Sequence, residues 1–145
     1  MLLTLGEKRP PLLRIFVVDD NATLRTTLRA VLEREDEWTV VGEAVSGRDA
    51  LETFDDHRAN VTVMDYSMPE MDGLEASRHL KERDPGAVIL MVTADPTIQL
   101  QREARKAGVN GFCPKDKIAC LITAIKALAR GKKHFHYREP AQTAA

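Results

Sequence analysis

The sequence has few aromatic residues, few cysteines and no long apolar run. Aromatic residues make up 5% of its 145 residues, and only two residues are cysteine. No apolar stretch approaches the roughly 20 residues that a membrane helix needs. The N-terminal leucines follow no basic segment and are interrupted by Gly6, Glu7 and Lys8, which is not the pattern of a signal peptide. We therefore expect a cytoplasmic protein without a membrane partner.

The sequence also has no excess of positive or negative charge. The chain has 21 basic and 22 acidic residues and a net charge of −1, which favours no nucleic acid partner for this domain. Cys113 and Cys120 lack both CxxC spacing and neighbouring metal ligands. We interpret them as small buried side chains in a reducing compartment.

Short apolar segments alternate with amphipathic ones along the chain. The predicted strands are 13–18, 38–44, 61–65, 87–93 and 111–113. Helices are expected between them, with Ser46 capping the second, Gly73 beginning the third, and Asp95 and Pro96 as cap and first residue of the fourth. A last helix is expected at 118–130. Five β-α units predict an α/β fold with a doubly wound parallel sheet, and Pro114 suggests that the fifth strand lies at its edge.

Polar side chains follow four of the five predicted strands. Asp19 and Asp20 follow the first strand, Asp65 ends the third, Thr93 ends the fourth and Lys115 follows the fifth. Ligands of such sheets bind beyond the carboxyl ends of the strands, where these side chains would converge. Three carboxylates suit Mg²⁺, and Asp65 could then be the nucleophile of a phosphoryl transfer, with Lys115 and Thr93 binding the phosphoryl oxygens.

Asp65 has two alternative interpretations, one structural and one enzymatic. A strand can end on an acid because that residue is the first to reach water. Asp65 could also be the nucleophile of a phosphohydrolase, but such enzymes place a second acid two residues later, where this chain has Ser67.

These residues, in this order and spacing, resemble the receiver domain of bacterial two-component response regulators. The resemblance rests on Asp19-Asp20 after LRIFVV, on DYSMPEMDG, on Thr93-Ala94 and on Lys115, and it spans residues 12–131. It implies a flavodoxin-like (βα)5 fold with strand order 2-1-3-4-5. It also implies that Asp65 accepts a phosphoryl group from a sensor histidine kinase or phosphotransfer protein. A receiver is not an enzyme beyond its own Mg²⁺-dependent phosphorylation and dephosphorylation, and a degenerate receiver would act only as an interaction domain.

The resemblance also assigns roles to single residues. Asp20, Asp65 and the main-chain oxygen of Ser67 would hold Mg²⁺, with Asp19 supporting the ion through water. Thr93 and Phe112 would form the switch pair, and Ser67 and Asp95 would flank the water that hydrolyses the phosphoryl group. One departure is that Pro114 precedes Lys115, whereas many receivers have a cis proline after the lysine.

The end of the domain, GVNGFCPKD followed by LITAIKALARGK, resembles the NarL-type class of transcriptional regulators. Such proteins usually add a DNA-binding domain, so this chain is either a stand-alone receiver or its output domain lies outside this sequence. Residues 1–11 would be an N-terminal extension. Residues 132–145 would be a C-terminal tail, which we interpret as solvated; a basic arm that binds nucleic acid is the alternative. The last helix is apolar nearly all round, which suggests a homodimer or partner surface used on phosphorylation.

Overall fold

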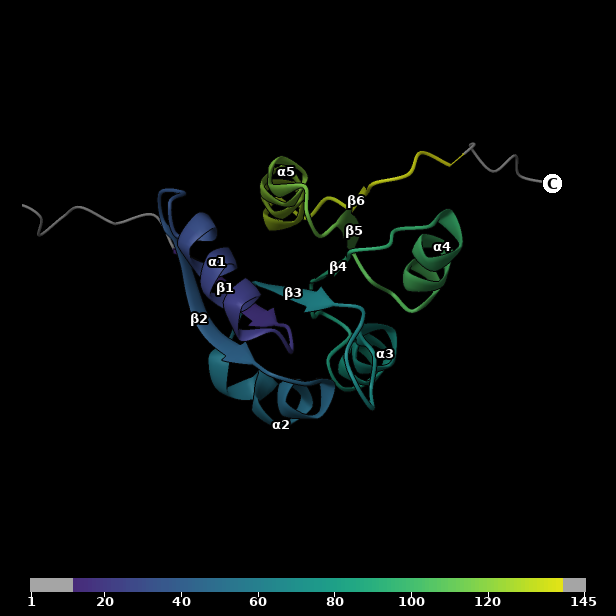
Figure 1. The fold of residues 1–145 in the computed structure, drawn as a ribbon, viewed down its shortest axis with the longest axis horizontal. Helices are drawn as coiled ribbons and strands as arrows, with labels where there is room; N and C mark the ends of the chain where they lie inside the picture. Colours follow the sequence, from purple (N-terminus) through teal and green to yellow (C-terminus); the bar gives the residue numbers. More distant parts are fainter. Residues whose placement is uncertain (1–11, 140–145) are drawn as a thin grey trace, which may run out of the picture.

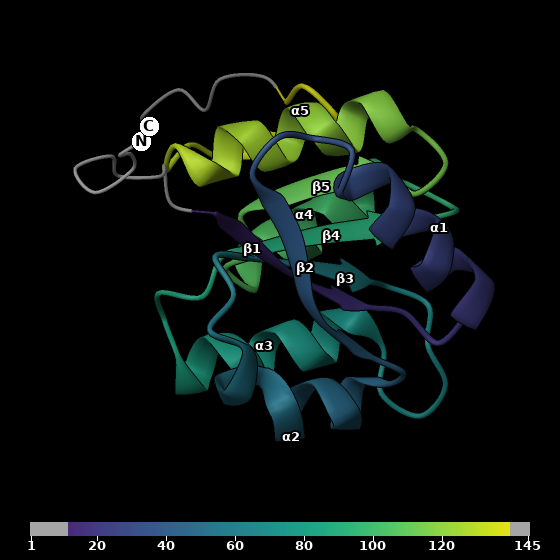
Figure 2. The ribbon, with the colours of Figure 1, turned by 90° about the vertical axis from the view of Figure 1, so that its left-hand side faces the viewer.

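The computed structural model describes residues 12–139, which form a parallel sheet between two layers of helices (Figure 1). The sheet order is β2-β1-β3-β4-β5-β6. Helices α1 and α5 cover one face, and α2, α3 and α4 cover the other (Figures 1 and 2). The strands are β1 (Leu13–Val18), β2 (Trp38–Ala44), β3 (Val61–Asp65), β4 (Ile89–Thr93), β5 (Gly111–Pro114) and β6 (His134–Phe135); the helices are α1 (Ala22–Leu32), α2 (Gly47–His57), α3 (Gly73–Arg83), α4 (Ile98–Lys106) and α5 (Ile118–Ala129).

The doubly wound α/β fold with strand order 2-1-3-4-5 is therefore confirmed, with one strand added beyond β5. Every residue of β3 and β4 is buried, because both faces of these central strands are covered by helices. This burial explains the unbroken apolar runs that identified them. No helix in residues 12–139 is long and apolar enough to cross a membrane.

Side-chain caps fix where the first four helices begin. The side chains of Asn21, Ser46 and Asp72 accept hydrogen bonds from main-chain N–H groups in the first turns of α1, α2 and α3. The cap predicted at Ser46 is confirmed: its hydroxyl accepts from Asp49 N–H at 3.0 Å.

The predicted start of the fourth helix is wrong. Asp95 is exposed and does not cap α4; the cap is Thr97, whose hydroxyl accepts from Leu100 N–H at 3.0 Å. The Asp95 N–H group donates instead to Thr93 Oγ1 at 3.1 Å. This bond holds residues 93–95 in a turn, so the chain passes Pro96 before the helix begins.

The expectation of a solvated tail from residue 132 is also wrong for the part that the structure describes. His134 and Phe135 form β6, which pairs with Gly111 and Phe112 of β5. The buried Gln101 of α4 then binds the main chain of Tyr137 on both sides, accepting from its N–H and donating to its oxygen, each at 2.8 Å. We call residues 134–139 the C-terminal strap.

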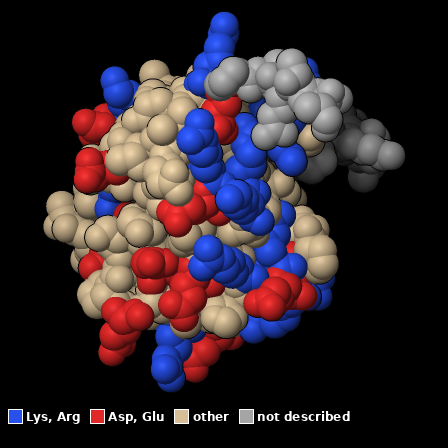
Figure 3. All heavy atoms as spheres, turned by 90° about the vertical axis from the view of Figure 1, so that its right-hand side faces the viewer, with Lys and Arg blue, Asp and Glu red and all other residues tan. Residues whose placement is uncertain are grey.

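The strap also makes charged and aromatic contacts with α4. Lys and Arg side chains gather on the side of the molecule where α4 and the strap lie (Figure 3). There Glu139 accepts from Arg102 Nε at 2.8 Å, and the Arg105 guanidinium lies 3.9 Å from the centre of the Phe135 ring. Because β6 covers β5, the predicted edge position of β5 is wrong along Gly111–Phe112, although β6 stops short of Pro114.

Candidate functional site

Five predicted site residues meet at the carboxyl ends of β1, β3, β4 and β5. Asp19, Asp65 and Thr93 are almost completely buried, with exposed fractions of 1%, 2% and 2%. Asp20 is exposed at the rim, and Lys115 is partly buried. The parallel order of the strands brings these side chains together from positions up to 96 residues apart (19 to 115).

Lys115 links the two buried carboxylates. Its Nζ lies 2.8 Å from Asp19 Oδ2 and 3.2 Å from Asp65 Oδ1. Both contacts are ion pairs between the ammonium group and a carboxylate. The Lys115 N–H donates to Thr93 O at 2.7 Å, which continues the pairing of β4 and β5 past Pro114. Lys115 is therefore held at the rim by its main chain and by two carboxylates.

The main chain on both sides of Asp65 is also fixed. Tyr66 N–H donates to Val92 O at 2.9 Å, and Gly73 N–H donates back to Tyr66 O at 2.7 Å. A Cβ atom at Gly73 would lie 2.2 Å from Asp65 O, so only glycine allows α3 to begin this close to the end of β3. The hydrogen bond from Gly73 to Tyr66 therefore holds together the two ends of the loop that follows Asp65.

Asp19 is positioned by groups that the sequence analysis missed. Its Oδ1 accepts from Asn21 N–H at 2.8 Å, and its main-chain oxygen accepts from Arg25 at 2.6 Å. Arg25 is itself paired with Glu43 of β2 at 3.0 Å. No local pattern indicates this pairing, because Arg25 and Glu43 belong to different elements and meet only in the folded sheet.

The electrostatics of the rim favour a cation or an added proton. Burial, and then repulsion from Asp19, raises the pKa of Asp65 to about 6 despite the attraction of Lys115. Burial alone would lower the pKa of Lys115, but its contacts with Asp19 and Asp65 outweigh burial and raise that pKa. Lys115 is therefore charged at neutral pH, while Asp65 is ionised at a cost.

The residues present fit a magnesium ion. Asp19, Asp20 and Asp65 each offer a carboxylate oxygen, and these atoms lie within 4.8 Å of one another. The buried Oδ2 of Asp65 has no hydrogen-bond partner in the described part of the chain. Hard carboxylate oxygens of this kind are ligands that Mg²⁺ takes in proteins.

The remaining predicted residues, Ser67, Asp95 and Phe112, differ in their burial. Thr93 Oγ1 accepts from Asp95 N–H, and both Asp95 and Ser67 are exposed. Phe112 is completely buried, with its ring centre 6.5 Å from that of Tyr137 in the strap. The roles predicted for Ser67, Asp95 and Phe112 stay predictions.

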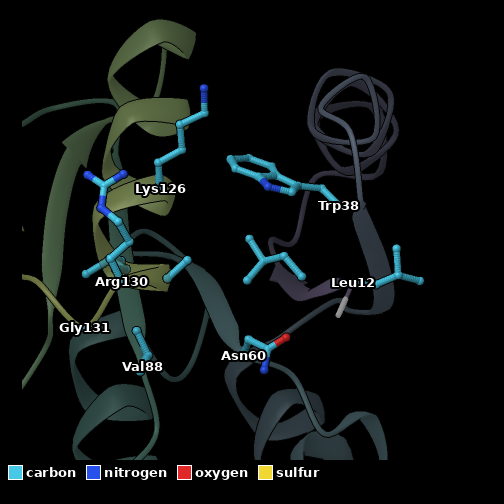
Figure 4. A pocket seen from close by; sticks show the side chains of 10 residues that line it. Leu12, Trp38, Asn60, Val88, Lys126, Arg130 and Gly131 are labelled. Atoms are coloured by element: carbon cyan, nitrogen blue, oxygen red, sulfur yellow. The ribbon is translucent and has the colours of Figure 1, made fainter. Parts of the chain in front are cut away.

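A groove of about 560 Å³ lies at the other end of the sheet. It is lined by the starts of β1 and β2 and the end of α5, with Trp38, Lys126 and Arg130 among its side chains (Figure 4). The carboxylates lie at the ends of the strands, not at their starts, so this groove is not part of the acidic site.

Comparison with known proteins gives a consistent family. The family model described as "Response regulator receiver domain" matches residues 15–126. The transcriptional regulatory protein YdfI of Bacillus subtilis is 33% identical over 119 residues, covering 81% of this chain and 55% of that protein. The chemotaxis protein CheY of Halobacterium salinarum is 36% identical over 119 residues, covering 77% of this chain and 98% of that protein. The chain thus spans about half the length of YdfI but nearly all of this CheY.

Solved structures agree with the sequence relatives. A LuxR-family two-component response regulator from Aurantimonas sp. SI85-9A1 has a TM-score of 0.82 and 31% identity, covering 85% of this chain and 89% of that one. The receiver domain of a putative response regulator NarL from Mycobacterium tuberculosis has a TM-score of 0.79 and 29% identity, covering 85% and 100%. The predicted likeness to the NarL-type class is confirmed.

Proposed function

The chain belongs to the response regulator receiver domain family, and we propose that Asp65 is the residue by which it accepts a phosphoryl group. The donor would be a phosphohistidine on a sensor histidine kinase or phosphotransfer protein. The observation that carries the proposal is the environment of Asp65: Lys115 lies 3.2 Å from its Oδ1, while its buried Oδ2 has no hydrogen-bond partner among the described residues.

The transfer needs little more than positioning and charge. An oxygen of Asp65 bonds to phosphorus while the phosphorus–nitrogen bond of the donor breaks, and the donor histidine leaves as imidazole. Lys115 would neutralise one phosphoryl oxygen, and the Thr93 hydroxyl would donate a hydrogen bond to another. Asp19, Asp20, Asp65 and the Ser67 main-chain oxygen would hold Mg²⁺, which when bound supplies the positive charge that offsets repulsion between the acids and the phosphoryl group.

The two acids of the first strand would contribute differently. Asp19 is committed to Lys115 and to Asn21 N–H, whereas Asp20 is exposed at the rim and free of such contacts among the described residues. This difference supports direct ligation by Asp20 and a supporting role for Asp19. Replacing Asp20 with alanine should therefore weaken Mg²⁺ binding more than replacing Asp19, and equal losses in a metal titration would contradict the assignment.

The chemical test is phosphorylation with a small donor. Incubated with Mg²⁺ and acetyl phosphate, the wild-type protein should gain one phosphoryl group by intact mass, and Asp65→Asn should gain none. Asp95→Asn, which alters an exposed acid of the neighbouring loop, is the matched control and should still be labelled. A phosphoryl group found on Asp19 or Asp20, or steady turnover of a generic phosphate ester, would refute the proposal; the second result would favour a phosphohydrolase.

The proposal also covers the output of the domain. Receiver domains of this family generally signal rather than catalyse. Two of the relatives, of which this chain covers about half the length, are named as transcriptional regulatory proteins. We propose partner binding or self-association through α5, where Ile118 is 36% exposed and Ile122 is partly buried. Sedimentation with and without a phosphoryl mimic tests self-association, and a monomer under both conditions would exclude it.

A further inference from the structure

The two cysteines of the chain meet in the fold although they come from different elements. Cys113 lies on β5 and has no exposed surface, and Cys120 lies on the first turn of α5 and is partly buried. Their sulfur atoms are 2.8 Å apart. A third side chain joins them from the strap: one imidazole nitrogen of His134 and both sulfurs all lie within 4.8 Å of one another.

The pairing of β5 with β6 explains why His134 reaches the thiols. His134 is opposite Gly111, and Cys113 lies two residues further along the same strand. Residues two apart on a strand share a face, so Gly111 and Cys113 both face α5. A Cβ atom at Gly111 would lie 2.9 Å from the His134 main-chain oxygen. The missing side chain at Gly111 thus lets β6 approach on the face that carries the thiols.

Two thiols and an imidazole form a soft donor set. Burial, and then the neighbouring Cys120, raises the pKa of Cys113 well above its usual range, so this thiol stays protonated unless a cation stabilises the thiolate. A bound cation would replace the proton of each thiol, and two protons would go to solvent, while neutral imidazole would bind through one nitrogen. Thiolate and imidazole ligands select Zn²⁺ and Cu⁺ over hard ions such as Mg²⁺.

We propose that Cys113, Cys120 and His134 form a binding site for one thiophilic d¹⁰ cation, either Zn²⁺ or Cu⁺. The site is separate from the carboxylates at the rim and does not depend on phosphorylation of Asp65. Because its ligands come from β5, α5 and β6, the cation would join the strap to the body of the domain. The strap continues to Tyr137, whose hydroxyl donates to Pro96 O at 2.9 Å, so a fixed β6 also stabilises the loop before α4.

The experiment uses the full chain, reduced with a phosphine, in two arms. Zn²⁺ is titrated against a chromophoric chelator, and Cu⁺ is titrated without oxygen against a Cu⁺-specific chelator. Both arms contain excess Mg²⁺ and the Asp65→Asn substitution, so that binding at the carboxylates is not counted. One equivalent of either cation should bind, and the arm with the higher affinity identifies it. No competition with the chelator in either arm would refute the site.

Variants separate this site from adventitious binding. Cys120→Ser and His134→Ala, both at partly buried positions, should weaken binding about tenfold or more, because each removes one of three ligands. The matched control is His136→Ala, two residues from His134 on the exposed side of the strap, and it should leave affinity unchanged. Equal losses in His134→Ala and His136→Ala, or none in either, would contradict ligation by His134.

A second measurement does not depend on metal affinity. Hydrogen exchange of the β6 amides should slow when the cation is added to the wild type, and it should not slow in His134→Ala. Slowing in neither protein would overturn the proposal that the cation joins the strap to the domain. A disulfide between Cys113 and Cys120 that resists reduction by the phosphine, with no metal bound, would overturn the site itself.

Discussion

Replacing Asp65 with asparagine should stabilise the metal-free protein at neutral pH, by an amount that depends on pH. Burial raises the pKa of Asp65 from its ordinary value of 3.8 to about 6 in the folded protein. Between these two values the folded state binds the proton more tightly than the unfolded chain does. The free energy of unfolding of the wild type therefore falls as pH rises through this window. Asparagine does not ionise, so the variant avoids that loss.

The expected magnitude follows from the two pKa values. A shift of roughly two units corresponds to about 3 kcal/mol once Asp65 is fully ionised, near pH 7.5, and to about 0.5 kcal/mol near pH 4. The side chain is only 2% exposed, so solvent screening reduces these values little. For a domain of this size, about 3 kcal/mol corresponds to roughly 10 °C in Tm.

The assay is urea unfolding of both proteins with a chelator present, at several pH values from 4.5 to 7.5. Asp95→Asn is the control and should match the wild type at every pH, because Asp95 is exposed. Adding Mg²⁺ at pH 7.5 should stabilise the wild type more than Asp65→Asn and so narrow the gap between them. A gap that does not change with pH, or an Asp65→Asn protein less stable than the wild type at pH 7.5, would refute the reasoning.

Three further outcomes are expected. Gly73→Ala should lose about 1–3 kcal/mol in urea unfolding, because its Cβ would lie 2.2 Å from a main-chain oxygen of β3; a gain would show that α3 can shift. Gln101→Leu should lose about 2–3 kcal/mol and speed hydrogen exchange at Tyr137, whereas exposed Gln99→Leu should do neither. Asp95→Ala should keep its free energy of unfolding within about 0.5 kcal/mol of the wild type, because Thr97 is the cap of α4. It should nevertheless lengthen the phosphoryl lifetime several-fold. An unchanged lifetime would show that Asp95 does not orient the water that hydrolyses the phosphoryl group.

The sequence predicted the sheet well because its signals are local. The bounds of β1, β2 and β3 agree with the prediction, and β4 begins two residues late because Ala87 N–H belongs to the turn at Asp84. The cluster of site residues could be predicted once the strands were known, because a parallel sheet brings the residues that follow its strands to one edge. One of the three buried positions of α4 is the polar Gln101, whose burial no apolar pattern could indicate.

The failures came from contacts between distant segments. A two-residue strand has no periodicity, so β6 could be found only from the unpaired side of β5 and from the buried amide of Gln101. The cysteines lacked a metal-ligand neighbour in the sequence because His134 joins them only through that pairing. One unpredicted strand therefore decides both how residues 134–139 pack against the domain and which side chains surround the thiols.

The same strand bears on the switch role predicted for Phe112. The resemblance implies a ring that turns inward on phosphorylation, but Phe112 is already completely buried and its main-chain oxygen accepts from His136 N–H at 2.9 Å. Tyr137 stands beside the ring and is held by Gln101 and Pro96. If an outward ring displaced Tyr137 together with its main chain, the buried amide of Gln101 would lose these two partners, which costs about 1–3 kcal/mol or more. We therefore expect a movement of the Phe112 ring to be coupled to a movement of the strap.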